Sequence, residues 1–243
     1  MRKLIMALLV ITLLGVVAYS QRARIAERVM VVGLDARMGS NIIDTFEDGL
    51  HLTLCGAGGP MPAPNASGPC VAVVAGERLF IVDAGTDGVR NLGRMGFPIG
   101  SIEAVFITHF HSDHIDGLGE LATIRWVTAS NDEPLPVYGP EGVSKVANGF
   151  NAAYEQDFGY RHAHHGDSVA PLSGAGMQAM PFSPPKMGEL ETLVDDGDLK
   201  IQALTVDHSP IDAAVGYKFS YNRPLYTTHP ADHPHSIDTD CRS

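Results

Sequence analysis

The chain has 243 residues, 28 acidic and 17 basic side chains, a formal net charge of −11 and three cysteines. This length can bury one sizeable core, so we expect a single domain, and no repeat at a solenoid period is found. An acidic balance without a basic stripe argues against a polyanionic partner such as tRNA, because phosphate contacts supply most non-specific affinity for nucleic acids.

The N-terminus has the three parts of a secretory signal. Met1-Arg2-Lys3 is a basic start, an apolar segment follows it, and Ala18-Tyr19-Ser20 offers small residues where a signal peptidase cleaves. We therefore expect residues 1–20 to be a signal peptide and the protein to be exported, periplasmic or secreted. Without this segment the chain keeps 15 basic against 28 acidic residues, a charge of −13. The alternative is an uncleaved N-terminal membrane anchor.

Short strands are predicted next, over 51–54, 70–74 and 79–82, with the last two forming a hairpin. Cys55 and Cys70 bracket a loop rich in proline and glycine. In an oxidising compartment a disulfide across this loop would contribute about 3 kcal/mol. Two free, partly buried thiols are the alternative.

The density of metal-ligand side chains is highest just after the apolar run 104–107, where His109, His111, Asp113 and His114 follow one another closely. His109 and His111 have the period-two relation that points two side chains the same way, so both can meet one ion. Asp113 and His114 lie past the strand, before a helix expected over 117–129, and can face a second ion nearby. The alternative is a polar loop whose histidines only form hydrogen bonds.

The rest of the chain continues the pattern of an α/β domain. A strand is expected over 135–138, a helix over about 141–153, an irregular region up to 186, and strands over 199–206 and 213–221. The irregular region contains three further histidines, interpreted as a solvated loop or as a loop at the mouth of the site: His162, His164 and His165. The strand over 199–206 ends at Asp207-His208, so a histidine again sits at the carboxyl end of a strand.

The spacing His109-x-His111-x-Asp113-His114 resembles the HxHxDH motif of the metallo-β-lactamase superfamily. Other segments resemble its ribonuclease Z and arylsulfatase-like branch, from about 52 to about 221: His51-Leu-Thr-Leu-Cys-Gly-Ala-Gly-Gly-Pro60, Leu79-Phe-Ile-Val-Asp83-Ala-Gly85, Val206-Asp207-His208 and Gly216-Tyr217-Lys218-Phe219. The resemblance implies a four-layer αββα sandwich for residues 21–223, incomplete at its C-terminal end.

The resemblance also implies roles for the site residues. His208 would join His109 and His111 in a three-histidine zinc site, whose open position suits a water with its pKa lowered to about 7. Asp113 and His114 would hold a second zinc, and Asp113 would orient or deprotonate the attacking water. Asp83 would support the ligand loop by hydrogen bonds, with a strand-end turn residue as the alternative. Asp207 is placed in the same supporting class.

Residues 224–243 depart from the family pattern. They lack the Ser-Gly-Asp-Thr-like turn that supplies a bridging aspartate, and they lack the last histidine that follows it. We interpret them as an aberrant, disordered tail from a frameshift or truncation and expect close to one zinc per chain. The alternative is a substitute ligand set made by Asp232, His233, His235 and Asp238.

These features predict an exported zinc-dependent hydrolase that cleaves an ester-like bond of a small molecule with metal-bound hydroxide. The bond would belong to a phosphodiester, a sulfate ester, or a carboxylic ester or lactone. One alternative is a truncated, non-catalytic metal-binding remnant of such an enzyme. The other is an RNA-processing nuclease of the ribonuclease Z type.

Overall fold

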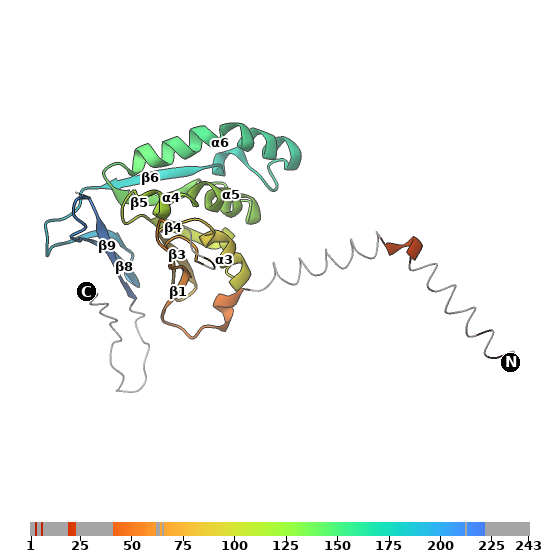
Figure 1. Cartoon of the computed structure of the whole chain (residues 1–243), viewed down its shortest axis with the longest axis horizontal. Helices are drawn as coiled ribbons and strands as arrows, with labels where there is room; N and C mark the ends of the chain where they lie inside the picture. Colours follow the sequence, from red (N-terminus) through yellow and green to blue (C-terminus); the bar gives the residue numbers. More distant parts are fainter. Residues whose placement is uncertain are drawn as a thin grey trace. The chain divides into compact units, whose positions relative to one another are not determined.

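The structure of the chain is a computed structural model that describes residues 41–61, 64, 66–211 and 213–221, with residues 3, 6 and 19–22 (Figure 1). The expected tail 224–243 and nearly all of the expected signal peptide lie outside the described residues. Within the described part, none of the helices has the length and hydropathy that a membrane crossing requires. The fold described below is that of the unit that begins at Ile42.

A six-stranded mixed sheet forms the centre of the domain, with its strands in chain order from edge to edge. The first three strands are antiparallel, whereas β3 to β6 run parallel to one another. Parallel neighbours place their carboxyl ends at one edge of the sheet, and this edge holds the motif that follows β4. The strands are β1 (Leu50–Gly56), β2 (Cys70–Ala75), β3 (Arg78–Val82), β4 (Ile102–Phe106), β5 (Leu135–Pro140) and β6 (Met177–Phe182).

Helices cover one face of this sheet, because parallel strands need crossover connections. Apolar side chains from the helices and from the sheet form one buried cluster, which includes Leu92, Val105 and Leu121. The helices are α3 (Gly88–Met95), α4 (Ser112–Ile115), α5 (Leu118–Thr128) and α6 (Val143–His165). Three short 3₁₀ turns complete this layer: η1 (Ile42–Thr45), η2 (Ile99–Ser101) and η3 (Leu172–Gly174).

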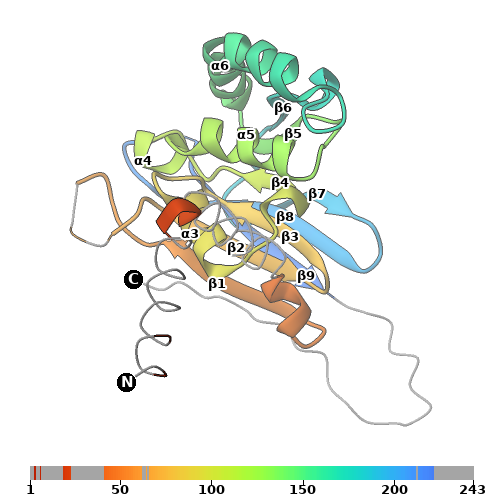
Figure 2. The same cartoon turned by 90° about the vertical axis from the view of Figure 1, so that its right-hand side faces the viewer.

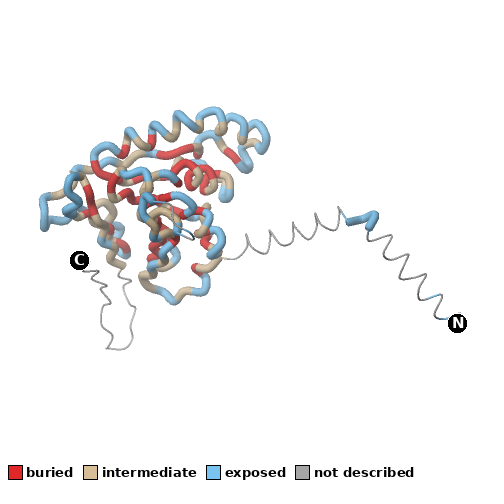
Figure 3. The backbone as a smooth tube through the Cα atoms, viewed as in Figure 1, coloured by how far each residue is buried: buried red, intermediate tan, exposed pale blue. Residues whose placement is uncertain are grey.

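A three-stranded antiparallel sheet faces the other side of the central sheet (Figure 2). Its strands are β7 (Leu190–Asp195), β8 (Leu199–Thr205) and β9 (Val215–Tyr221). The second core lies between the two sheets. There the ring centroid of Phe106 lies 5.2 Å from that of Tyr217 and 5.6 Å from that of Phe219. Buried stretches gather at the centre of the domain (Figure 3). The order helix, sheet, sheet gives three layers of the expected αββα sandwich; the described residues include no second helical layer.

The strands expected over 51–54, 70–74, 79–82, 135–138, 199–206 and 213–221 are confirmed as β1, β2, β3, β5, β8 and β9. The helix expected over 117–129 is confirmed as α5. The predictions between 141 and 186 are wrong in two respects: α6 continues to His165, and β6 occupies part of the region expected to be irregular. A contact distant in sequence holds the unpredicted strand β6, since the Asn151 side chain of α6 bonds both the N–H and the C=O of Met177.

Cys55 and Cys70 are joined by a disulfide, with their Cα atoms 5.0 Å apart and both side chains buried. Of the two possibilities that the sequence left open, the structure thus has the disulfide rather than two free thiols. It ties the end of β1 to the start of β2 and closes the loop between them. The amide of Asn91 in α3 donates to the Cys55 carbonyl at 2.7 Å, so the helical layer packs on the bridge.

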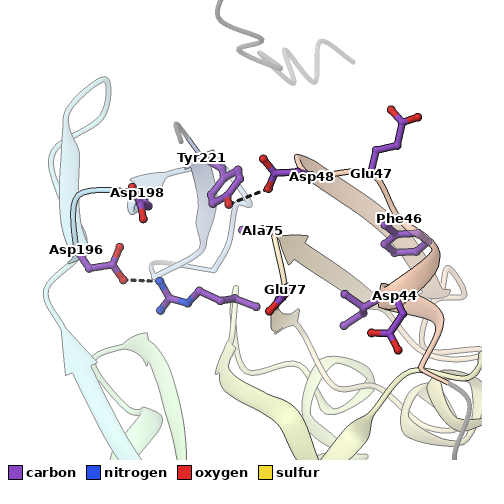
Figure 4. Close-up of a pocket in the computed structure, with 12 residues that line it drawn as sticks. Asp44, Phe46, Glu47, Asp48, Ala75, Glu77, Asp196, Asp198 and Tyr221 are labelled. Atoms are coloured by element: carbon purple, nitrogen blue, oxygen red, sulfur yellow. Dashed lines mark hydrogen bonds and ion pairs between the residues drawn. The ribbon is translucent and has the colours of Figure 1, made fainter. Parts of the chain in front are cut away.

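Arg78 links the two sheets at the amino end of β3. Its guanidinium donates to Glu103 at 2.7 to 3.0 Å and to Asp196, which lies between β7 and β8. Beside it is a cavity of about 520 Å³ (Figure 4), where the Tyr221 hydroxyl donates to Asp48 at 3.1 Å. Most of its charged lining residues are acidic: Asp44, Glu47, Asp48, Glu77, Asp196 and Asp198. Arg78 begins β3, whereas Asp83, which contacts His114, follows the other end of this strand. The cavity therefore lies at the opposite end of β3 from the histidines.

Candidate metal centre

The histidine motif lies at the carboxyl ends of β3 and β4, where backbone contacts also attach the second sheet. The Val215 N–H donates to the carbonyl of Thr108 at 3.0 Å, and the Tyr217 hydroxyl donates to that of Ile107 at 2.7 Å. These bonds hold the start of β9 against the motif loop. The short segment between β8 and β9 contains His208, so the same contacts bring this residue to His109 across 99 positions of sequence.

His109, His111 and His208 converge in space. One ring nitrogen from each lies within 4.8 Å of the others, and within the described parts of the chain no other group of three possible ligands meets this distance. The ring centroids of His109 and His208 are 4.7 Å apart, and those of His111 and His208 are 5.6 Å apart. His109 is buried, whereas His111 and His208 are exposed. The cluster is therefore open to solvent on one side, as substrate access requires.

The three imidazoles suit a zinc ion. Two nitrogens that each lie ~2.1 Å from a tetrahedral zinc are about 3.4 Å apart. The ring nitrogens of the cluster lie within 4.8 Å of one another, which is of the same order as this value. Burial, followed by the nearby His114, lowers the pKa of His109 to about 4, so this ring is neutral at pH 7 and keeps a lone pair for a metal. Binding of zinc itself stays a prediction.

Asp83 holds the ligand loop from beneath, as the resemblance implied. Its carboxylate accepts hydrogen bonds from the Thr108 N–H at 2.8 Å and from the Thr108 hydroxyl, and it lies 2.8 Å from His114 Nδ1. It is buried and has a φ of 57°, in the left-handed region that aspartate tolerates better than most residues. The carboxylate therefore fixes the orientation of two loop residues without belonging to the three-histidine group.

Asp113 and His114 lie beside the cluster in α4. His114 Nε2 is 3.8 Å from Asp113 Oδ2, and the His114 ring centroid is 4.1 Å from that of His109. Burial opposes protonation of His114, but the hydrogen bond and the charge of Asp83 prevail and raise its pKa above the ordinary value. A second metal position at this pair stays a prediction.

Two contributors to the site were missed by the sequence reasoning. The Thr108 hydroxyl contacts His109 Nδ1 at 3.0 Å, which leaves His109 Nε2 directed at His111 Nδ1, 2.9 Å away. Gly85 touches the backbone of α4 so closely that an added Cβ would lie 2.3 Å from the Asp113 carbonyl oxygen. The sequence signals for these two residues were weak: Thr108 stands between the strand and the first histidine, and Gly85 stands two positions after Asp83.

Other sequence candidates do not join the cluster. Asp207 is exposed, and its carboxylate accepts a hydrogen bond from the Ser209 N–H at 3.1 Å, so it contacts its own turn rather than a histidine. His162, His164 and His165 form the last turn of α6, which replaces the loop expected there. His162 Nδ1 contacts the Ala170 carbonyl at 3.0 Å. The substitute ligands proposed for residues 232–238 lie outside the described residues.

Comparisons with known proteins agree with this geometry. Residues 64–221 match the model of the Metallo-beta-lactamase superfamily. Ribonuclease Z of Mycobacterium marinum is 33% identical over 177 residues, covering 71% of this chain and 60% of the relative. Ribonuclease Z of Mycobacterium bovis is 34% identical over 173 residues, covering 70% and 58%. The chain thus spans about three fifths of the length of these relatives.

The solved structure of the short form of human tRNase Z is also similar, with a TM-score of 0.53 and 20% identity over 70% of this chain and 64% of that one. This likeness shows the fold alone. The names of the two relatives agree with the ribonuclease Z part of the expected resemblance, and these matches give no support to its arylsulfatase-like part. On the family match and on the converging histidines, the chain belongs to the Metallo-beta-lactamase superfamily.

Proposed function

We propose that this chain is a zinc-dependent hydrolase that cleaves an ester-like bond of a small anionic molecule, with phosphodiesters as the first class to test. The convergence of His109, His111 and His208 within 4.8 Å carries this proposal. Zinc held by three histidines with an open position supplies Lewis acidity and lowers the pKa of a coordinated water to about 7.

The chain's own residues would prepare this chemistry. Thr108 fixes the ring of His109, and Asp83 fixes Thr108, so the buried ligand is oriented before a metal arrives. The Asp113 carboxylate lies 3.8 Å from His114 Nε2 in α4, and it would orient the attacking water or accept its proton. The exposed faces of His111 and His208 leave an approach for the substrate.

Export of the protein is part of the proposal. A disulfide between buried cysteines is typical of proteins that fold in an oxidising compartment, and Cys55–Cys70 supports this location together with the signal-like N-terminus. The proposed second zinc at Asp113 and His114 is the weaker of the two, because among the described residues no group of three possible ligands includes this pair.

RNA is the second candidate substrate. The ribonuclease Z name of the relatives favours it, while the formal charge of −11 opposes binding of a polyanion. The two candidates differ in a simple observable, because RNA binding through phosphate contacts weakens steeply as salt rises.

Hydrolysis assays on the zinc-loaded chain test the proposal. The substrates are bis(4-nitrophenyl) phosphate, 4-nitrophenyl sulfate, a chromogenic carboxylic ester and lactam, and a 3′-extended tRNA precursor. We expect turnover of the phosphodiester that His111→Ala abolishes and that His164→Ala, a histidine of α6 outside the cluster, leaves unchanged. Zinc binding without turnover of any substrate would show the non-catalytic remnant, and cleavage of the tRNA precursor alone would show the nuclease.

A further inference from the structure

A shallow apolar groove lies between helices α4 and α6. Its volume is about 410 Å³. Five of its lining residues share one face of α6, at positions i, i+1, i+4, i+5 and i+8, and the sixth belongs to α4. Lys145 is the one charged lining residue, and the other five are apolar: Ile115, Val146, Gly149, Phe150 and Ala153.

The groove and the proposed ligands Asp113 and His114 share the short helix α4. This helix has four residues, and Ile115 directly follows Asp113 and His114 in it. Ile115, Val146 and Phe150 are partly buried and pack on the helical core, so the walls of the groove are fixed while one side of each remains open. A group held in the groove therefore has a rigid relation to the proposed ligands.

Gly149 leaves the groove open. A Cβ added at this position would meet no atom within 4 Å, although the residue lies inside a long helix, where alanine is more favourable than glycine. Gly159 has the same property nearly three turns further along α6, away from the groove. The two glycines form a matched pair for substitution.

We infer that this groove binds the apolar group, aryl or alkyl, of an anionic ester whose bond is cleaved at the metal centre. The inference rests on the proposed function and names the substrate class of that site. Lys145 is exposed and makes no ion pair with any described residue, so its ammonium at the rim is available to a negatively charged substrate. The acidic cavity at the other end of β3 has the opposite charge and would repel such a molecule.

The size of the groove decides between a small molecule and a protein partner. The lining positions 145 to 153 span about 12 Å along the helix axis. A specific protein interface buries more than about 1,000 Å² in total, which this short strip of one helix does not offer. Since a cavity of about 150 Å³ accepts a benzene ring, the groove has room for a bicyclic aromatic group.

Binding of 1-naphthyl phosphate, phenyl phosphate and inorganic phosphate to the zinc-loaded full chain tests the inference by calorimetry, without any need for turnover. We expect 1-naphthyl phosphate to bind at least about tenfold more tightly than phosphate, because the ring is removed from water. Gly149→Leu fills the groove and should abolish this difference while leaving phosphate binding unchanged. Gly159→Leu should behave as the wild type.

Lys145→Gln tests the charge at the rim. It should weaken 1-naphthyl phosphate several-fold at low salt and leave the affinity for neutral 1-naphthol unchanged. Equal affinities for 1-naphthyl phosphate and phosphate in the wild type, or a Gly149→Leu variant with wild-type affinities, would overturn the inference. A tight, Gly149-dependent complex without turnover would instead leave the groove established and refute the hydrolase. Turnover with equal KM values for naphthyl and phenyl substrates, in the wild type and in Gly149→Leu alike, would instead establish the hydrolase and refute the binding role of the groove.

Discussion

His114 Nδ1 lies 2.8 Å from Oδ2 of Asp83, a residue 31 positions earlier in the chain. The same carboxylate accepts from both the N–H and the hydroxyl of Thr108, whose hydroxyl also contacts His109. One buried carboxylate thus orients two histidines of the motif from different sides. Since each of these histidines lies at a proposed metal position, a substitution of Asp83 should change metal binding at both positions.

We expect Asp83→Asn to lower zinc affinity by about 10- to 100-fold, because partners that orient ligands typically have effects of this size. Asparagine tolerates the positive φ of position 83, so the backbone should be kept and the change confined to the charge and to one hydrogen-bond acceptor. Competition with a fluorescent zinc chelator measures the affinity. Asp207→Asn is the control, since Asp207 contacts only its own turn in the described contacts. An unchanged affinity in Asp83→Asn would refute the orienting role.

We expect His208→Ala to remove tightly bound zinc, because the cluster loses one of its three nitrogens. Zinc content after dialysis, measured by mass spectrometry, gives the result directly. In the wild type, free zinc at 100 times its Kd should also stabilise the fold by about 2.7 kcal/mol, since the ligand binds the folded state. This stabilisation should vanish in His208→Ala and persist in His164→Ala. A His208→Ala variant that keeps its zinc would exclude the three-histidine site.

The centre of the site was predictable because it follows strand ends. The apolar run before His109 and the alternating strand before His208 each predict where a strand stops, and the structure stops them there, at Phe106 and Thr205. These two strands belong to different sheets, however, so the pattern alone does not bring their ends together. The family resemblance implied the convergence, and in the structure the bonds from Val215 and Tyr217 to the motif loop hold the two segments against each other.

The rest depended on contacts that no local pattern contains. The second half of α6 has no strong amphipathic pattern, and it is held by Phe158, whose ring centroid lies 5.7 Å from that of Trp126 in an edge-on contact. The side chain of Asn151, in the first half of α6, bonds Met177 at the start of β6. In the same way, the role of Thr108 appears only when Asp83 is brought beneath it from β3. Sequence reasoning therefore singled out the histidines that converge and missed much of their support.

Reduction of the Cys55–Cys70 disulfide should lower the free energy of unfolding by about 3 kcal/mol, the value expected for a sequence separation of 15 residues. Urea denaturation with and without a phosphine reductant measures the difference. The double variant Cys55→Ala, Cys70→Ala should be insensitive to the reductant, whereas Cys241→Ser should respond as the wild type does. Reductant sensitivity that survives in the double variant would place the effect elsewhere than in this bridge.

The Arg78–Asp196 contact between the two sheets should make stability depend on acid pH. The hydrogen bond from Arg78, followed by that from the Leu199 N–H, lowers the pKa of Asp196 below its ordinary value. A carboxyl group whose pKa is lower in the folded state contributes stability that is fully present above its unfolded pKa of about 3.9 and is lost as the pH falls through the folded value.

Asp196→Asn should therefore be less stable than the wild type at pH 7, and the difference should shrink below a pH of about 3.9. Urea denaturation at pH 7, 5 and 3 measures it, and Asp198→Asn is the control, because Asp198 lines the same cavity without bonding the guanidinium through its side chain. The contact is partly exposed, so the effect should also weaken in high salt, as expected for a solvated ion pair. A difference that is the same at all three pH values would show that the Asp196 charge does not couple the sheets.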